Sequence, residues 1–184
     1  DGKSAFDEFG SSISLSGDGS FVAIGAGYGD SNLSNSGYVR IYKNVNNVWT
    51  QVGSDIDGET AGDLSGWSLS LSSDGSVVAI GAPDNNGNGS NSGHVRIYKN
   101  ENNNWTQVGS DIDGKASGDR LGRSVSLSAD GTVVAIGAPG DSNGTDGGRV
   151  RIYKNVNNTW TQIGDDIDGE TAGDLSGWSL SLSS

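Results

Sequence analysis

Short apolar runs alternate with polar segments along the whole chain. Residues 11–16 read Ser-Ser-Ile-Ser-Leu-Ser, so Ile13 and Leu15 fall on one side and the serines on the other. This period of two is typical of a half-buried β-strand. Residues 21–26 are almost continuously apolar, which favours a strand covered on both faces. The same reasoning predicts strands at 38–43 and 48–52, so that one unit is four antiparallel strands.

Turn residues separate the predicted strands. Gly17-Asp18-Gly19 lies between the first two, and an Asp-Gly pair between apolar runs is a strong hairpin signal. We expect a type I′ turn there, with a positive φ at both central residues. An Asn-rich turn at 44–47 joins the last two strands. No helical period interrupts the pattern, so the sequence predicts an all-β protein.

The four-strand pattern is an internal repeat. Gly10, Gly66, Gly122 and Gly177 mark its register, with spacings of 56, 56 and 55 residues. The triplets Ala-Ile-Gly and Arg-Ile-Tyr and a later tryptophan return with the same period. We therefore divide the chain into three units and the start of a fourth: 1–52, 53–108, 109–163 and 164–184.

One unit does not offer enough apolar surface to fold alone. Its clear inward residues are Ile13, Leu15, Val22, Ile24, Val39 and Ile41. Their burial stabilises the unit by roughly 9–18 kcal/mol, whereas ordering the backbone costs tens of kcal/mol. The units must stack, and radial stacking gives a β-propeller with one four-stranded blade of about 56 residues per unit.

The sequence thus predicts three blades plus the first strand of a fourth. Propellers usually need about four to eight blades to close. We therefore expect either a segment of a longer array or a ring that several copies of the chain close together.

Composition limits the partners of the protein. The net charge is −12, and an acidic surface repels phosphate backbones, so nucleic acid is not an expected partner. No apolar run approaches the roughly 20 residues of a membrane-spanning helix. The chain has no cysteine, so cysteine usage does not place it in a redox compartment.

Short motifs resemble a known repeat family. Phe9-Gly10 and the later Gly25-Ala26-Gly27 are similar to the Phe-Gly and Gly-Ala-Pro marks of FG-GAP repeats, and the second mark returns as Gly81-Ala82-Pro83 and Gly137-Ala138-Pro139. Such repeats form the blades of the integrin α-subunit propeller and of surface proteins in marine bacteria and algae. The resemblance implies an extracellular or cell-surface propeller with a structural or adhesive role. The Phe-Gly pair survives literally only at Phe9-Gly10.

Calcium is the cofactor that we considered. The integrin calcium loop does not carry over, because the corresponding Ser73-Asp74-Gly75 is too short to wrap an ion. A better candidate is the loop 84–89, which fits the first half of an EF-hand loop with alternating oxygen ligands. The predicted ligands there and in the equivalent loops are Asp30, Asn32, Asp84, Asn86, Asn88, Asp141 and Asn143. The alternative is a polar turn without a metal.

Acidic and cationic residues also recur between the strands. One acidic cluster contains Asp55, Asp57, Glu59 and Asp63, with counterparts from Asp111 to Asp119 and from Asp166 to Asp174. It could collect cations between blades, but we favour loops in which aspartates cap backbone amides. Arg40, Arg96 and Arg151 lie beside tyrosines, and we expect structural packing with a neighbouring acid rather than a grip on an anionic sugar.

The tryptophans fall into two groups. Trp49, Trp105 and Trp160 repeat in every unit and are expected to pack between blades. Trp67 and Trp178 begin predicted first strands, where they could line the central opening and stack on a sugar ring.

No catalytic constellation stands out. His94 is the only histidine and replaces Tyr38 and Arg149 at its repeat position. The sequence therefore predicts a non-enzymatic module that presents loops for protein or glycan contact at the cell surface. Two alternatives stay open: a lectin-like glycan binder, and a module that assembles with copies of itself into a ring or filament.

Overall fold

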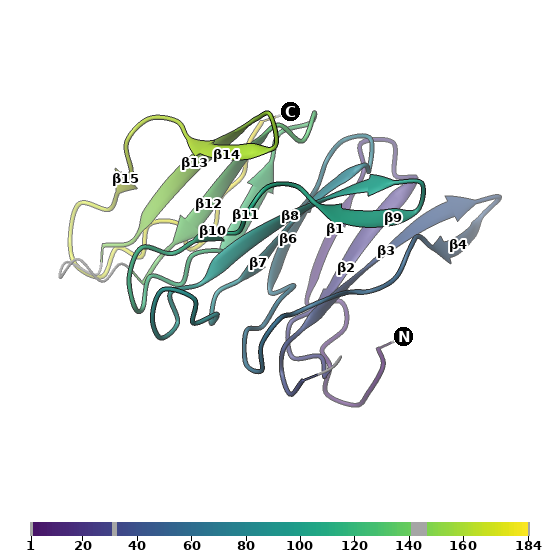
Figure 1. Cartoon of the computed structure of the whole chain (residues 1–184), viewed down its shortest axis with the longest axis horizontal. Helices are drawn as coiled ribbons and strands as arrows, with labels where there is room; N and C mark the ends of the chain where they lie inside the picture. The colour runs from purple at the N-terminus through teal and green to yellow at the C-terminus, as the bar shows by residue number, and fades with distance from the viewer. Residues whose placement is uncertain (1, 31–32, 141–146, 184) are drawn as a thin grey trace.

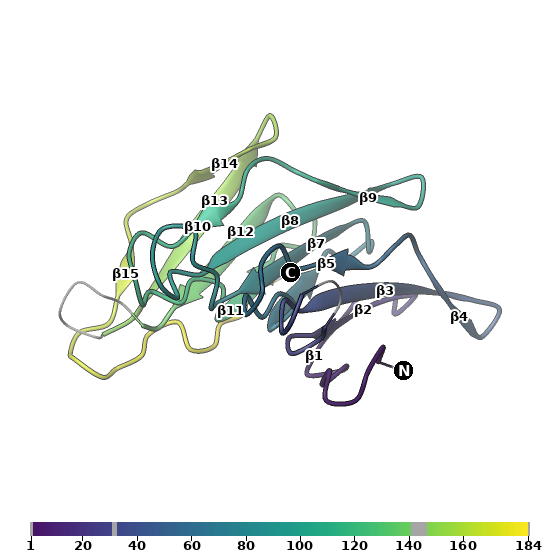
Figure 2. The same cartoon turned by 60° about the horizontal axis from the view of Figure 1, so that its bottom comes forward.

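The computed structural model describes residues 2–30, 33–140 and 147–183, which form three antiparallel sheets placed side by side in chain order (Figures 1 and 2). The first sheet contains β1 (Ser12–Leu15), β2 (Phe21–Ala26), β3 (Tyr38–Val45), β4 (Val48–Gln51) and β5 (Ile56–Asp57). The second contains β6 (Ser68–Leu71), β7 (Val77–Ala82), β8 (His94–Glu101), β9 (Asn104–Gln107) and β10 (Ile112–Asp113). The third contains β11 (Ser124–Leu127), β12 (Val133–Ala138), β13 (Arg149–Val156), β14 (Thr159–Gln162) and β15 (Ile167–Asp168).

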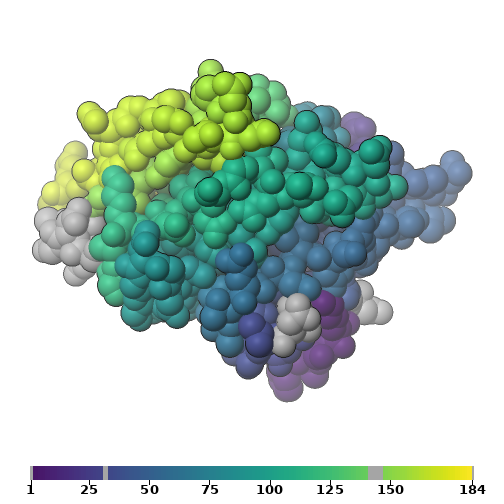
Figure 3. Space-filling model, in the orientation of Figure 1, coloured from purple at the N-terminus to yellow at the C-terminus, as the bar shows by residue number. Residues whose placement is uncertain are grey.

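Each sheet is one propeller blade, as predicted. Its four main strands follow one another as a meander, with β1, β6 and β11 on the inner edge. The inner strands of neighbouring blades contact each other, which is how blades converge toward a central axis. The arrangement is an open, partial propeller, and the second blade lies between the other two (Figure 3). No helix occurs in the part of the chain that the structure describes.

The prediction missed a fifth short strand in every blade. β5 pairs with the start of β3, where Tyr38 lies opposite Asp57 and Val39 opposite Ile56. Two residues carry too little periodicity to be recognised as a strand. The strand lies beyond residue 52 in the chain, yet it extends the first sheet.

The type I′ turn was predicted in the wrong hairpin. In the β1–β2 turn only Gly19 has a positive φ, and Asp18 instead accepts hydrogen bonds from Ser16 and Ser20. The backbone N–H and then the hydroxyl of Ser20 are the main cause that lowers the pKa of Asp18 to about 2. The β3–β4 turn is the one with two left-handed residues, Asn46 at φ 52° and Asn47 at φ 65°. Asparagine tolerates this conformation, so Asn-Asn takes the place that Asn-Gly often fills.

The hydrophobic cores lie between blades rather than within them. One core joins Val39 and Ile41 of the first blade to Leu69 and Leu71 of the second, and an equivalent core joins the second blade to the third. The six inward residues predicted for a unit therefore divide between two faces. Each of these cores is therefore shared by two neighbouring blades.

The first blade has one open face. Ile13 and Leu15 are 60% and 57% exposed, whereas the equivalent Leu69 and Leu71 are 9% and 7% exposed. Phe9, Leu15, Val22, Ile24, Tyr42 and Trp49 line a shallow hollow of about 400 Å³ on this face.

Serine hydroxyls join the inner strands of neighbouring blades. The hydroxyl of Ser12 donates to the carbonyl of Gly66 over 2.6 Å, and Ser68 and Ser124 repeat this bond to Gly122 and Gly177. Another serine of each strand accepts an N–H of the next blade, as Ser14 does from Leu71 over 3.0 Å. The polar positions of these strands thus point toward the next blade and not toward solvent.

The predicted first strand of a fourth blade is not a strand in the structure. No strand is assigned among the described residues after β15. Even so, the N–H of Leu182 donates to the hydroxyl of Ser126 over 3.0 Å, as in the complete blades. The segment lies where an inner strand belongs but has no ladder of its own.

Glycine on the second strand of a blade permits this close stacking, and Gly81→Ala in β7 tests its importance. A Cβ at Gly81 would overlap the backbone carbonyl of Gly122 in the third blade, which cannot move aside as a side chain could. We expect the free energy of unfolding in urea to fall by about 1–3 kcal/mol. Gly27→Ala is the matched control, because its Cβ would meet Trp67 at an ordinary 3.5 Å. Equal stability of the two variants would contradict this account of the blade contact.

Candidate functional site

A cation and two indoles form a stack at the beginning of the inner strands. Trp67, Arg123 and Trp178 each follow the register glycine of their unit. The guanidinium carbon of Arg123 lies 4.6 Å from the centre of the Trp67 ring and 4.2 Å from that of Trp178. Both distances are within the range of a cation–π contact. The stack therefore crosses from the second blade to the fourth unit.

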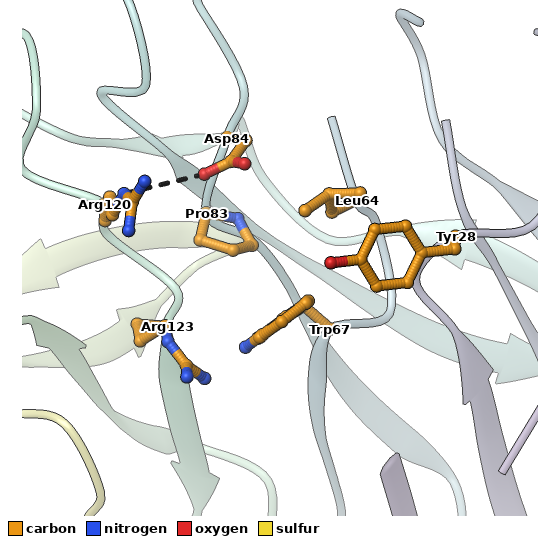
Figure 4. A pocket seen from close by; sticks show the side chains of 7 residues that line it. All are labelled: Tyr28, Leu64, Trp67, Pro83, Asp84, Arg120 and Arg123. Carbon is orange, nitrogen blue, oxygen red and sulfur yellow. Dashed lines mark ion pairs between the residues drawn. The ribbon is translucent and has the colours of Figure 1, made fainter. Parts of the chain in front are cut away.

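Beside the stack lies a hollow of about 170 Å³, which we call the inner hollow. It is lined by Tyr28, Leu64, Trp67, Pro83, Asp84, Arg120 and Arg123. Figure 4 shows Asp84 and Arg120 on one side and Trp67 and Arg123 on the other. Asp84 pairs with Arg120 at 3.7 Å, and the edge of Tyr28 faces Trp67 with 5.9 Å between ring centres.

The inner hollow is locally cationic although the protein is acidic. Burial, followed by the neighbouring Arg120, lowers the pKa of Arg123. Two guanidinium groups near one carboxylate leave an excess of positive charge at this place. An anionic group with an apolar ring would match both the charge and the aromatic lining.

The indole N–H groups separate the two classes of tryptophan. Trp105 donates to the carbonyl of Val52 over 2.9 Å and Trp160 to that of Val108 over 2.9 Å, so both tie a blade to the preceding one. Within the described residues, the indole nitrogen of Trp67 has no hydrogen-bond partner, and Trp178 is 51% exposed. The structure thus brings Trp67 and Trp178 together through Arg123, a contact that sequence reasoning missed.

In the structure, four of the predicted calcium ligands form hydrogen bonds or ion pairs with other groups of the protein. The carboxylate of Asp30 accepts the N–H of Asn35, and the amide oxygen of Asn86 accepts that of Asn91. Asn88 donates to the carbonyl of Gly114, while Asp84 pairs with Arg120. Asn32, Asp141 and Asn143 lie outside the described residues. Calcium binding at these loops stays a prediction.

Two members of the acidic cluster cap backbone amides, as we favoured, but these two are buried rather than solvated. Asp63 and Asp119 are 1% and 2% exposed. Asp63 accepts the N–H of Thr60, and Asp119 accepts those of Lys115 and Ala116. Burial of a carboxylate is tolerated here because it is hydrogen-bonded within its own turn.

The residues matched by the FG-GAP repeat family model are 1–42 and 110–153, which fall in the first and third blades. These are FG-GAP repeats. The middle unit lies outside the matched residues but carries the same triplets at the same period. A search of curated proteins found no match.

Solved structures share the propeller architecture of these FG-GAP repeats. A Bacteroides uniformis protein described, provisionally, as a 6-phosphogluconolactonase is 17% identical, with a TM-score of 0.56 over 86% of this chain and 40% of that one. Sqt1 of Saccharomyces cerevisiae is 11% identical, with a TM-score of 0.57 over 91% of this chain and 38% of that one. The chain thus spans about two fifths of each protein, and the likeness shows the fold alone.

The repeated arginines of the FG-GAP blades are structural, as predicted. Arg40 donates to Asp55 over 3.0 Å, and its guanidinium lies 5.1 Å from the ring centre of Tyr38. Arg151 is fully buried and donates to Asp166 over 3.1 Å. Arg96 departs from this pattern and pairs with Glu59 instead.

His94 is 2% exposed at the start of β8. Burial, followed by the charge of Arg96, lowers its pKa. No hydrogen bond joins it to a serine among the described residues, so the structure offers no nucleophile–base pair around the only histidine.

Acid sensitivity tests the ion pairs of the third blade. Burial opposes ionisation of Asp166, but hydrogen bonds from Gln162, Lys115 and Arg151 hold its pKa well below the usual value. Its contribution to stability is therefore complete above the unfolded pKa of about 3.9 and is lost as the pH falls through the lower folded pKa.

Urea titration measures the free energy of unfolding at each pH. From pH 5 downward, we expect this free energy to fall less steeply in Asp166→Asn than in the parent protein. Some slope should remain, because Asp18 and Asp130 have a pKa of about 2. Asp165→Asn removes the same charge from an exposed neighbour and should keep the slope of the parent protein. The same slope for both variants would contradict the role of Asp166.

Proposed function

We propose that this chain is a non-enzymatic propeller module that binds an acidic glycan at the stack and the inner hollow. The observation that carries this proposal is Arg123, whose guanidinium lies against both Trp67 and Trp178. Indole faces stack on the apolar face of a sugar ring, and a guanidinium binds a carboxylate or sulfate. These two kinds of contact meet here beside the inner strands of the second and third blades.

A non-enzymatic role fits the chemistry of the inner hollow. Among the described residues that line it, Asp84 is the only carboxylate and pairs with Arg120, and none is a histidine, serine or threonine. Catalysis by general acids and bases needs a positioned group that exchanges a proton with the substrate. The residues of the hollow therefore support ligand binding rather than catalysis.

We place this module at the cell surface or in the extracellular space, as a structural or adhesive element. FG-GAP repeats are typical of extracellular proteins. No helix in the described part of the chain has the length and apolar character to cross a membrane. Weak calcium binding in the loops near Asp30 and Asp84 belongs to the same proposal.

A glycan titration tests this function. The probe is an oligosaccharide of uronic acids, with a neutral glucose oligosaccharide of equal length as the comparison. We expect the uronic-acid probe to change Trp fluorescence and to bind more tightly by calorimetry. Trp178→Ala and Arg123→Gln should each weaken binding by about tenfold or more, which corresponds to about 1.4 kcal/mol.

Trp49→Ala is the matched control, since Trp49 is 45% exposed but lies on the open face of the first blade. This variant should bind the glycan as the parent does. Equal binding by all variants, or no binding of either oligosaccharide, would exclude a glycan site at the stack.

Assembly with further blades is the second candidate function. The open face of the first blade exposes Ile13, Leu15 and Trp49, whose equivalents in the other blades pack against a preceding blade. A blade of a second copy would bury this apolar surface, as the first blade buries the equivalent surface of the second.

Light scattering over a range of concentrations tests assembly. We expect a mass that rises above that of the monomer with concentration, and a constant monomer mass for Leu15→Glu. Phe6→Glu is the control, because Phe6 is 92% exposed and does not line the hollow of this face. A monomer at every concentration for the parent would exclude self-assembly.

A further inference from the structure

A second hollow, separate from the stack, surrounds the only histidine of the chain. It has a volume of about 460 Å³ and lies between the connector that leads into the second blade and the outer end of that blade. Its lining includes Glu59, His94, Asp111 and Asp113. Asp113 lies opposite His94 in the pairing of β10 with β8. The hollow therefore gathers three carboxylates and one imidazole.

Comparison of the three blades shows that Asp111 lacks the cationic partner of its counterparts. In the first blade, Asp55 pairs with Lys3 at 2.7 Å and with Arg40 at 3.0 Å. In the third blade, Asp166 pairs with three cations: Lys115, Arg149 and Arg151. In the second blade, the equivalent Asp111 accepts a hydrogen bond from Gln107, and within the described residues no lysine or arginine pairs with it.

The repeat position of His94 explains the difference. This position is Arg149 in the third blade, whose guanidinium lies 2.8 Å from Asp166. In the second blade an imidazole takes the place of the guanidinium, and Arg96 turns to Glu59 and to the carbonyl of Asp57. The carboxylate of Asp111 therefore occupies the repeat position of Asp166 without the guanidinium partner that Asp166 has.

The imidazole of His94 is itself without a hydrogen bond among the described residues, although the residue is 98% buried. Its Nδ1 lies 3.7 Å from Oδ2 of Asp111, which is too long for a hydrogen bond. The imidazole of this buried histidine faces both a hollow and a carboxylate. It is therefore arranged to bind a ligand between the ring and the carboxylate.

The spacing of these atoms fits a shared metal ion. One ligand atom each from Glu59, His94 and Asp111 lies within 4.8 Å of the others. Ligands about 2.1 Å from a tetrahedral Zn²⁺ are about 3.4 Å apart, close to the 3.7 Å between His94 and Asp111. Small rotations of Glu59, whose side chain is 49% exposed, would complete the set.

We propose that Glu59, His94 and Asp111 bind a divalent transition-metal cation of the Zn²⁺ type. One imidazole and two carboxylates are ligands that Zn²⁺ accepts in proteins, and the hollow leaves room for a water as the fourth ligand. Arg96 pairs with Glu59 at 3.1 Å, but its single charge is opposed by three carboxylates in the hollow.

The ion would connect parts of the chain that no disulfide can join. Glu59 belongs to the connector between the first two blades, whereas His94 and Asp111 belong to the second blade. Binding would fasten this connector to the blade and stabilise the native state.

The test is a Zn²⁺ titration of the full chain without a histidine tag. We expect binding of one equivalent by calorimetry, a higher midpoint of thermal unfolding, and a shift of the single imidazole signal in the NMR spectrum. The variant His94→Arg reproduces the residue of the third blade and supplies Asp111 with a guanidinium. It should fold, and its affinity for Zn²⁺ should fall by about tenfold or more.

Three further measurements make the outcome decisive. Asp111→Asn should weaken Zn²⁺ binding as His94→Arg does, and Asp165→Asn, which removes an exposed charge elsewhere, should not. His94→Gln replaces His94→Arg if the latter does not fold. The proposal is overturned if the imidazole signal does not move, or if the His94 variants bind Zn²⁺ as the parent does.

Discussion

The contact between the inner edges of neighbouring blades is the constraint on which the structure depends. At Gly25, Gly81 and Gly137, the next blade's backbone carbonyl occupies the place of a side chain. These glycines lie on β2, β7 and β12, and the same carbonyls accept serine hydroxyls from the inner strands that pair with them. Because backbone meets backbone, the distance between blades is set by atoms that cannot adjust. The apolar side chains farther out, such as Val39 and Leu69, then fill the space that this distance leaves.

The stability of the protein therefore depends on the interfaces between blades rather than on the individual sheets. A residue such as Leu15 has the same sequence context as Leu71, yet one is 57% exposed and the other 7%. The difference comes entirely from the presence of a preceding blade. Each repeat thus presents an apolar surface that is buried only when another repeat packs against it. This dependence on the neighbouring repeat is general in quasi-one-dimensional repeat proteins.

Periodicity was sufficient for the four main strands of each blade, and the lack of a helical period was sufficient for the all-β class. The alternation at 11–16 and the apolar run at 21–26 correspond to β1 and β2. What periodicity could not show is the partner of each polar side chain. Ser12 and Ser14 looked like a solvated face but bond to the next blade, and β5 is too short to leave a pattern. At the candidate site, Trp67 and Trp178 were recognisable as aromatic residues on inner strands.

Arg123 escaped notice because its type differs, although its position after the register glycine is the same. This miss indicates where information about function lies in a repeat protein. Arg40 and Arg151 occupy a position that all blades share. Their ion pairs with Asp55 and Asp166 give them a structural role in the fold. A residue that departs from the repeat is not required for these ion pairs, because the neighbouring blades have the same fold without it. Arg123 and His94 are two such departures, and each faces a hollow lined by residues of complementary chemistry.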